Sequence, residues 1–388
     1  MKKLLLAATV ATLAMNAAQA APTLYGKLSV TLDNIDNNDF KDESVVKVNS
    51  NASRLGVKGE EKLTDNLSAV YLAEWEIWAD GDGDAFKNRN RFVGVKSAGV
   101  ATLKVGQHDS YFKTAAGNNQ DIFNDHNELD MTAVLAGEDR LKNVIGFETD
   151  KKLLGGLAFN IMFQQGENAA TSATAKTSTT SLAGITTEKT VVTNYGLKDA
   201  RDGFGDGVSA SLTYENKDMG LAAAVAANRA IASKFNAYDL SGIYTDAVRV
   251  TGSLDLGAMG ASGLVLGALW QTAKPTDDVV AVITTTKETN KPDTVKNNSF
   301  KGLKEDAYGV TAAYAIPSTP VKLKAQYISA TTEVDGMKDR QQDLYGVGAD
   351  YQINKQARFY GIVAQQKRDW LTKDDKKTNI GLGMEYNF

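Results

Sequence analysis

The sequence predicts an all-β fold, a transmembrane antiparallel β-barrel of about 16 strands. Three observations indicate this fold. Apolar and polar residues alternate at period two along much of the chain, long polar connections alternate with short turns, and no apolar run beyond the first residues is long enough for a membrane-spanning helix. Barrel strands hide their apolar residues in such alternation, because one face of each strand meets lipid and the other meets water.

The first twenty residues predict a secretory signal. Two lysines precede the apolar run 4–15, and Ala18-Gln19-Ala20 has the small-x-small pattern of a cleavage site. We therefore expect residues 1–20 to be a signal peptide and residues 21–388 to form the barrel. Export leads into an oxidising compartment, yet the chain has no cysteine, so its stability cannot come from disulfides.

The period-two alternation is visible close to both ends of the chain. Near the start, apolar residues alternate with polar ones: Leu24, Leu28, Val30 and Leu32 against Lys27, Ser29, Thr31 and Asp33. The last strand carries its apolar face on Ile380, Leu382, Met384, Tyr386 and Phe388. A soluble β-sandwich alternates in the same way, so the pattern alone leaves that fold open.

The lengths of the connections favour the barrel over the sandwich. Short turns are expected at 62–66, 97–99, 216–219, 316–320 and 353–356. Long polar connections are expected near 79–88, 109–138, 166–206, 273–304, 330–341 and 367–378. This one-sided distribution is typical of an outer-membrane barrel with long extracellular loops and short periplasmic turns.

Strand counting sets the size of the barrel. About seventeen candidate strands are present, whereas a bacterial barrel with both termini in the periplasm needs an even number. Strict up-and-down order requires 248–255 to descend, so we assign 235–245 to a loop between 229 and 246. About 16 strands remain, enough to enclose an aqueous channel. The segment 166–206, rich in Ala, Ser and Thr, is expected to be an exposed, mobile loop.

Several motifs, in order along the chain, resemble the general Gram-negative outer-membrane porin family, whose members are trimeric diffusion porins. The motifs are Leu24-Tyr25-Gly26-Lys27, Ser53–Glu61, Arg89–Val95, Leu103–Gly106 and the terminal Tyr386-Asn387-Phe388. The segment 165–300 matches only in strand rhythm. The resemblance implies a homotrimer embedded in outer-membrane lipid, a pore for ions and small hydrophilic solutes, and a terminal aromatic residue that serves barrel assembly.

The resemblance also implies where the pore is narrowed. In such porins the third loop folds into the lumen, and its acidic residues face basic side chains on the wall. The matching wall positions are Lys27, Arg54, Arg89 and Arg140. The candidate constriction loop is 109–138, and its acids are Asp121, Asp125, Glu128 and Asp130. The short acidic motif that often marks the tip of this loop is not recognisable here.

Strand parity gives separate support for three of the four basic positions. Arg54 alternates with Leu55, Arg140 with Leu141, and Lys27 with its apolar neighbours, so these three point away from lipid. Arg89 shares its parity with two valines, Val93 and Val95. We therefore place both valines inside, beneath the infolded loop. Lys322, Lys324 and Arg249 are expected to add solvated positive charge to the same inner wall.

The sequence gives weaker support to a calcium site, a transition-metal site, a catalytic site or a sugar-binding site. The carboxylates of Asp80–Asp84 alternate as in a calcium loop, but the twelfth position would be Arg91 where glutamate is needed. With two histidines, His108 and His126, and no cysteine, the usual transition-metal sites cannot be assembled, and no cofactor is expected. No nucleophile motif accompanies His108. The aromatic residues Tyr71, Trp75, Trp78, Tyr351, Tyr360, Tyr386 and Phe388 fit interfacial girdles better than a sugar-stacking site.

The charge balance excludes one partner class and leaves several functions open. A net charge of −4 argues against nucleic acid. The leading hypothesis is passive diffusion rather than enzymatic activity. Three alternatives remain: a channel that prefers anions or small carboxylates, an outer-membrane barrel enzyme or adhesin, and a soluble secreted sandwich that binds carbohydrate.

Overall fold

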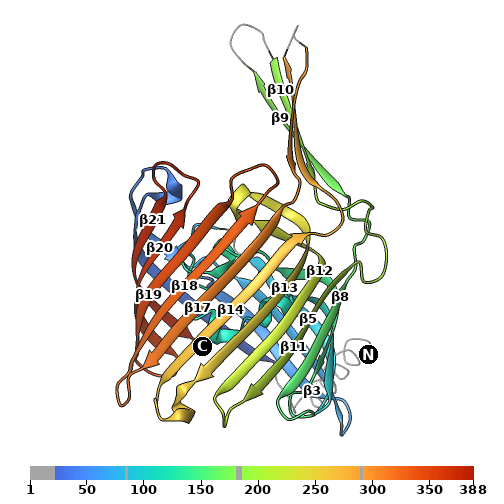
Figure 1. The fold of residues 1–388 in the computed structure, drawn as a ribbon. Coiled ribbons are helices and arrows are strands. Elements are labelled where there is room, and N and C mark those ends of the chain that lie inside the picture. Colours follow the sequence, from blue (N-terminus) through green and yellow to red (C-terminus); the bar gives the residue numbers. More distant parts are fainter. Residues whose placement is uncertain (1–21, 84–85, 124, 181–185, 289–291) are drawn as a thin grey trace, which may run out of the picture.

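The computed structural model describes residues 22–83, 86–123, 125–180, 186–288 and 292–388. In these residues the chain forms a closed antiparallel barrel (Figure 1). The barrel strands are β1 (Thr23–Asp36), β2 (Val45–Ser50), β3 (Arg54–Lys62), β4 (Leu67–Glu76), β5 (Lys87–Ser97), β6 (Ala101–Asp109), β7 (Arg140–Thr149), β8 (Leu157–Gln164), β11 (Gly207–Asn216), β12 (Leu221–Phe235), β13 (Leu240–Asp255), β14 (Leu264–Pro275), β17 (Lys304–Ala315), β18 (Val321–Glu333), β19 (Arg340–Gln352), β20 (Ala357–Arg368) and β21 (Lys376–Asn387). The predicted signal peptide, 1–20, lies outside the described residues.

The described strands occupy sixteen positions in the wall. β2 and β3 count as one position, because both pair with β1, β2 along its second half and β3 along its first residues. β1 also pairs with β21, and this seam closes the barrel. Short turns join the strands at one end and longer connections at the other (Figure 1). The predicted fold class, strand number and division of loops are confirmed.

Burial follows the predicted alternation, with the apolar side chains outside. Leu24 and Leu32 are 61% and 56% exposed on the outer face, whereas Lys27 and Asp33 on the same strand are buried inside. The barrel is thus apolar on its outer surface and polar within, whereas a soluble sandwich is polar on its outer surface and apolar within. Among the predicted girdle aromatics Tyr360 is an exception, since it is buried and lies 2.9 Å from the Ser29 hydroxyl.

The assignment of 229–246 to a loop is wrong. β12 and β13 continue past the place where strict parity ended them and meet at a short turn, η3 (Asn236–Tyr238). A bulge in the β12–β13 ladder, with Ala230 at a φ of 51°, interrupts the period-two pattern and hides this continuity from sequence counting. Phe235 and Ile243, at the extended end of the hairpin, are fully buried.

The assignment of the whole of 166–206 to a loop is also wrong. This segment contains β9 (Ser172–Thr180) and β10 (Thr186–Asn194), and the connection 273–304 contains β15 (Val280–Glu288) and β16 (Thr294–Phe300). The four strands pair in the order β16-β15-β10-β9 and form a sheet that projects from the rim (Figure 1). Threonine-rich segments favour strands once a partner is available, and here the partner comes from another loop.

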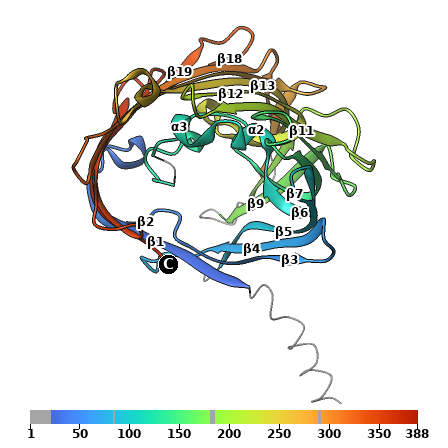
Figure 2. The same cartoon turned by 90° about the horizontal axis from the view of Figure 1, so that it is seen from below.

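The remaining elements are short. The segment 110–139 holds α2 (Tyr111–Thr114), α3 (Gly117–Gln120) and η2 (Met131–Ala133), and Figure 2 shows α2 and α3 inside the ring of strands. Two further turns are η1 (Asn38–Phe40) and η4 (Leu256–Met259). None of the helices in the described part of the chain has the length and apolarity needed to cross a membrane.

Candidate pore constriction

The segment 110–139 is fixed along one side of the lumen. Its apolar residues are buried against the wall, and Phe112, Leu129 and Met131 are inaccessible to solvent. Polar wall side chains bind its backbone, as in the hydrogen bonds from Gln326 Nε2 to the Leu129 carbonyl (3.0 Å) and from Gln342 Nε2 to the Ala133 carbonyl (2.9 Å). These contacts satisfy backbone groups that would otherwise be buried without partners.

Arg249 lies beneath this loop, so the expectation that it adds solvated charge to the lumen is wrong. Its side chain is inaccessible to solvent, forms a 2.5 Å ion pair with Glu138 and covers the Phe112 ring at 4.3 Å. Its Nε also donates to Gln271 Oε1 at 2.9 Å. Lys324 is likewise covered, at 3.0 Å from Asp350. Arg249 and Lys324 therefore have structural ion pairs and add no unpaired positive charge to the lumen.

Asp125, near the tip of the loop, meets three of the four predicted wall cations. The Lys27 Nζ lies 2.7 Å from Asp125 Oδ2, Arg54 forms an ion pair with the same oxygen, and Arg89 Nη2 lies 3.9 Å from Oδ1. Burial alone would raise the pKa of Asp125, but the positive charges of Arg54 and Lys27 lower it to about 2. Asp125 therefore stays ionised at any physiological pH.

A β-bulge explains how Arg89 reaches this cluster. Between β4 and β5 the register shifts, so that Glu74 on β4 faces two residues, Arg89 and Asn90, on β5. The bulge changes the parity, and both β5 residues point inward, with Arg89 Nε donating to Glu74 at 2.6 Å. Val93 and Val95 are exposed on the outer face, so placing them inside was wrong.

Arg140 lies apart from the Asp125 cluster. It forms an ion pair with Asp109 (3.1 Å) and donates to Asn90 Oδ1 (2.7 Å). The parity argument for Arg140 does not hold, because Leu141 is also buried inward, against Tyr111 of the infolded loop. Arg140 is the first residue of β7 and reaches the lumen despite its neighbour.

The other three predicted loop acids have separate environments. Glu128 forms a 2.6 Å ion pair with Lys377, and Asp130 accepts the Thr132 N–H at 2.8 Å. Asp121 is half-buried, and its Oδ1 is buried without a hydrogen-bond partner among the described residues. Burial, with added repulsion from neighbouring carboxylates such as Asp130, raises the pKa of Asp121 well above its usual range. Of the four acids, Asp125 alone reaches the predicted basic wall.

A polar cavity of about 830 Å³ lies between the loop and the wall. Wall residues on its lining include Arg54, Glu74, Arg89, Asp109 and Arg140, and loop residues include Asp121, Asp125, Asp130, Glu138 and Asp139. Sequence reasoning missed the wall acids Glu74 and Asp109. The signal was present in Glu74, a carboxylate between two apolar residues, Ala73 and Trp75, on a membrane strand.

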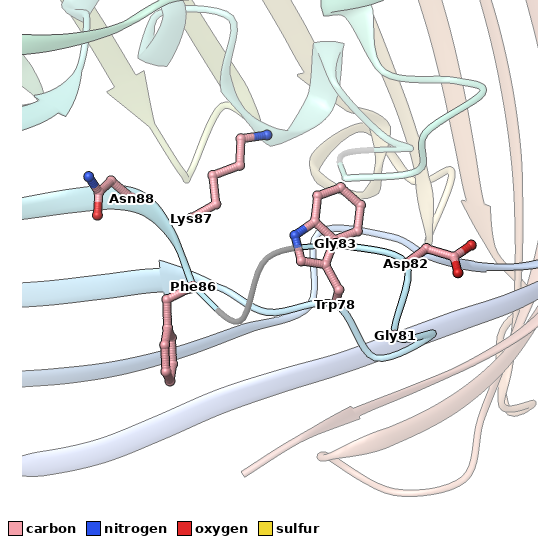
Figure 3. Close-up of a pocket in the computed structure, with 7 residues that line it drawn as sticks. All are labelled: Trp78, Gly81, Asp82, Gly83, Phe86, Lys87 and Asn88. Carbon is pink, nitrogen blue, oxygen red and sulfur yellow. The ribbon is translucent and has the colours of Figure 1, made fainter.

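The alternating aspartates lie in the outer loop near 79–88. Figure 3 shows its shallow pocket around Trp78, with Lys87 and Phe86 pointing to opposite sides. Asp80 accepts the Ser50 N–H at 2.6 Å, and Asp84 lies outside the described residues. Within the described ranges no group of three His, Cys, Asp or Glu side chains could hold an ion. His108 and His126 are both buried.

Comparison with known proteins agrees with this architecture. The chain is 30% identical over 176 residues to the major outer membrane protein P.IB of Neisseria meningitidis serogroup B, a match that covers 44% of this chain and 51% of the relative. A second P.IB, from Neisseria sicca, is 27% identical over 179 residues, 44% of this chain and 48% of the relative. The chain thus spans about half the length of the curated relatives it matches.

Among solved structures, the chain is similar to the anion-selective porin from Comamonas acidovorans, with a TM-score of 0.64 and 18% identity, covering 95% of this chain and 100% of that one. At this identity the likeness establishes the fold. The family described as Gram-negative porin matches residues 6–370, nearly the whole sequence. The chain therefore belongs to the Gram-negative porin family and, with that family, to the outer membrane.

Proposed function

We propose that this chain is a general diffusion porin, which lets ions and small hydrophilic solutes cross the outer membrane passively through a water-filled pore. One observation carries the proposal: a loop folded into a closed barrel brings the carboxylate of Asp125 against Lys27, Arg54 and Arg89 beside a polar cavity. Fixed charges of both signs on the lining of a narrow aqueous cavity orient dipolar solutes and sort ions by sign.

The proposal includes processing and assembly. Residues 1–20 are removed on export, and residues 21–388 form the barrel, which assembles as a homotrimer in outer-membrane lipid. Valines and leucines point outward, for example Val93 (60% exposed) and Leu103 (45% exposed). Their exposure supports an outer surface that contacts lipid or a neighbouring subunit. The predicted acids and bases serve as a filter, and we assign none of them a catalytic role.

A second candidate, a channel that prefers anions or small carboxylates, is favoured by one specific observation. Two cations on the cavity lining, Arg368 and Lys234, have no carboxylate within 4.0 Å among the described residues.

Planar-bilayer recording tests the proposed function. Purified protein should give stepwise, water-filled conductance, and the charge reversal Arg54→Glu should shift the reversal potential toward cations under a salt gradient while the trimer still assembles. Asp65→Asn, at a turn where the side chain is 94% exposed, is the control and should leave the reversal potential unchanged. A silent bilayer would overturn the pore, and an unchanged potential in the Arg54 variant would overturn the constriction assignment.

A further inference from the structure

The outer mouth of the barrel carries a row of alternating aromatic rings and guanidinium groups. Arg368 lies 4.2 Å from the Phe40 ring and 5.6 Å from the Trp370 ring, and Arg340 lies 5.4 Å from Trp370 and 4.0 Å from Tyr238. Phe40 lies in η1, Tyr238 in η3, Arg340 in β19 and Arg368 in β20, and Trp370 lies in the loop that follows β20. The row therefore links connections that are distant in sequence and fixes the orientation of both guanidinium groups.

Arg368 differs from the other arginines on the cavity lining. The other three each pair with a carboxylate: Arg54 with Asp125, Arg89 with Glu74, and Arg140 with Asp109. No described carboxylate oxygen lies within 4.0 Å of the Arg368 guanidinium, and its Nε is buried without a hydrogen-bond partner. The acids that influence it, Asp239 and Asp39, act from a longer distance.

Lys234 lines the same cavity and is also free of ion pairs in the described part of the chain. The remaining lysines on that lining, Lys87, Lys113 and Lys377, each have a carboxylate within 4.0 Å. The two unpaired cations thus line one aqueous cavity, whose lining also includes Arg89 and Arg140. The lining as a whole is balanced, with eight basic and eight acidic side chains among the described residues. What distinguishes Arg368 and Lys234 is therefore the lack of a carboxylate within 4.0 Å, not an excess of charge in the cavity.

The geometry suits one class of ligand. Aromatic rings flank the guanidinium of Arg368, which leaves its N–H edge as a planar fork of donors. Such a fork matches a carboxylate or phosphate oxyanion and can donate two parallel hydrogen bonds. The flexible ammonium of Lys234, on the lining of the same cavity, adds charge without a fixed direction, so it can follow oxyanions of different size.

We propose that Arg368 and Lys234 form an oxyanion-binding site in the outer vestibule, which concentrates small carboxylate- or phosphate-bearing solutes above the constriction. This inference rests on the proposed function, since it names the solutes that the pore would favour. It differs from the Asp125 cluster in its residues and in its place, at the end of the barrel that carries the long connections.

Current recordings with two probes, succinate and inorganic phosphate, test the site. In bilayers of neutral phosphatidylcholine, both should reduce the chloride current of the wild-type channel in a saturable way. The variant Arg368→Gln/Lys234→Gln should raise the half-blocking concentration about tenfold, as expected for loss of about 1.4 kcal/mol of binding. Arg368→Lys, which keeps the charge but loses the planar fork, should also weaken the block.

The matched control is Lys373→Gln, which removes one charge from the same outer loop at an exposed side chain that does not line the cavity. It should keep the wild-type half-blocking concentration. Equal block in wild type and the double variant, or equal weakening by the control, would overturn the site while leaving the pore intact. A channel that conducts nothing would overturn the pore as well, so the two failures are distinguishable.

A lipid headgroup is a second possible source of the same oxyanion. Repeating the recordings with phosphatidylglycerol in the bilayer separates the two sources. A site for soluble solutes should be blocked by succinate equally in both bilayers. Block that disappears when the anionic lipid is present would identify the lipid phosphate as the occupant and overturn the solute assignment.

Discussion

At the scale of single residues, the lumen charges are arranged as contacting pairs. Asp125 shares its oxygens among Lys27, Arg54 and Arg89, and Glu74 also binds Arg89. Buried or half-buried pairs of this kind are screened less by salt than exposed pairs. Loss of one cation leaves Asp125 with other partners, whereas loss of Asp125 leaves several cations close together.

The first prediction follows from this asymmetry. Asp125→Asn should shift the reversal potential toward anions under a potassium chloride gradient, because the charges of Lys27 and Arg54 lose the carboxylate they share. The exposed Asp65→Asn variant removes the same charge from a turn outside the lumen and should behave as wild type. A wild-type potential in the Asp125 variant would show that this carboxylate does not face the permeating ions.

The second prediction concerns pH. Burial raises the pKa of Asp139, on the cavity lining, to about 6, although the Ser233 hydrogen bond opposes this. Because the pKa is raised, Asp139 is ionised at pH 7 and becomes neutral as the pH falls below about 6, while Asp125 keeps its charge. The selectivity should therefore shift toward anions between pH 7 and pH 5, and this shift should be smaller in Asp139→Asn. Recordings of the reversal potential from pH 7 to pH 5 measure this shift.

At the scale of elements, the infolded loop depends on a few buried contacts with β13 and its neighbours. Arg249 pairs with Glu138, and Gln271 donates to the Ala136 carbonyl at 3.0 Å, so the returning half of the loop is fixed from beneath. Removing one partner of a buried ion pair leaves the other charge uncompensated, whereas replacing both partners can be almost neutral.

The third prediction uses that difference. Arg249→Met should destabilise the docked loop by about 3–5 kcal/mol, because Glu138 is left buried without its cation. The expected results are larger single-channel conductance and faster proteolysis of the loop in an intact barrel. The double variant Arg249→Met/Glu138→Gln should restore most of the wild-type behaviour. If the double variant had the same raised conductance as the single variant, the docking of the loop would not depend on the ion pair.

The sequence could predict strands and the direction of their side chains only where the pattern within one strand decides both. Parity placed Lys27 and Arg54 inside because no register shift interrupts the pairing of β1 with β3 or of β3 with β4. It failed for Arg89 because a bulge changes the parity of β5, and there the family resemblance, not the spacing, located the residue. Composition and loop length failed to predict β10 and β15, since each becomes a strand by pairing with a partner from a different loop.

At the scale of the whole molecule, the barrel exists only if its first and last strands meet. β1 and β21 pair from Lys27–Asn387 to Asp36–Thr378. Phe388 adds the final contacts of this seam, since its N–H donates to the Gly26 carbonyl at 3.0 Å and its carbonyl accepts the Gly26 N–H at 2.9 Å. Its ring stacks on Tyr386 at 6.4 Å on the outer face.

The last prediction concerns this closure. Deletion of Phe388 should lower the yield of assembled barrel, because it removes two hydrogen bonds and an outward aromatic ring from the seam, where an open edge in lipid is costly. Heat-modifiable electrophoretic mobility after detergent extraction measures the assembled fraction. Deletion of 172–194 is the control, since β9 and β10 belong to the projecting sheet and pair with no barrel strand among the described residues. If the Phe388 deletion assembled as well as this control, the terminal residue would be dispensable and the remaining β1–β21 ladder would suffice to close the barrel.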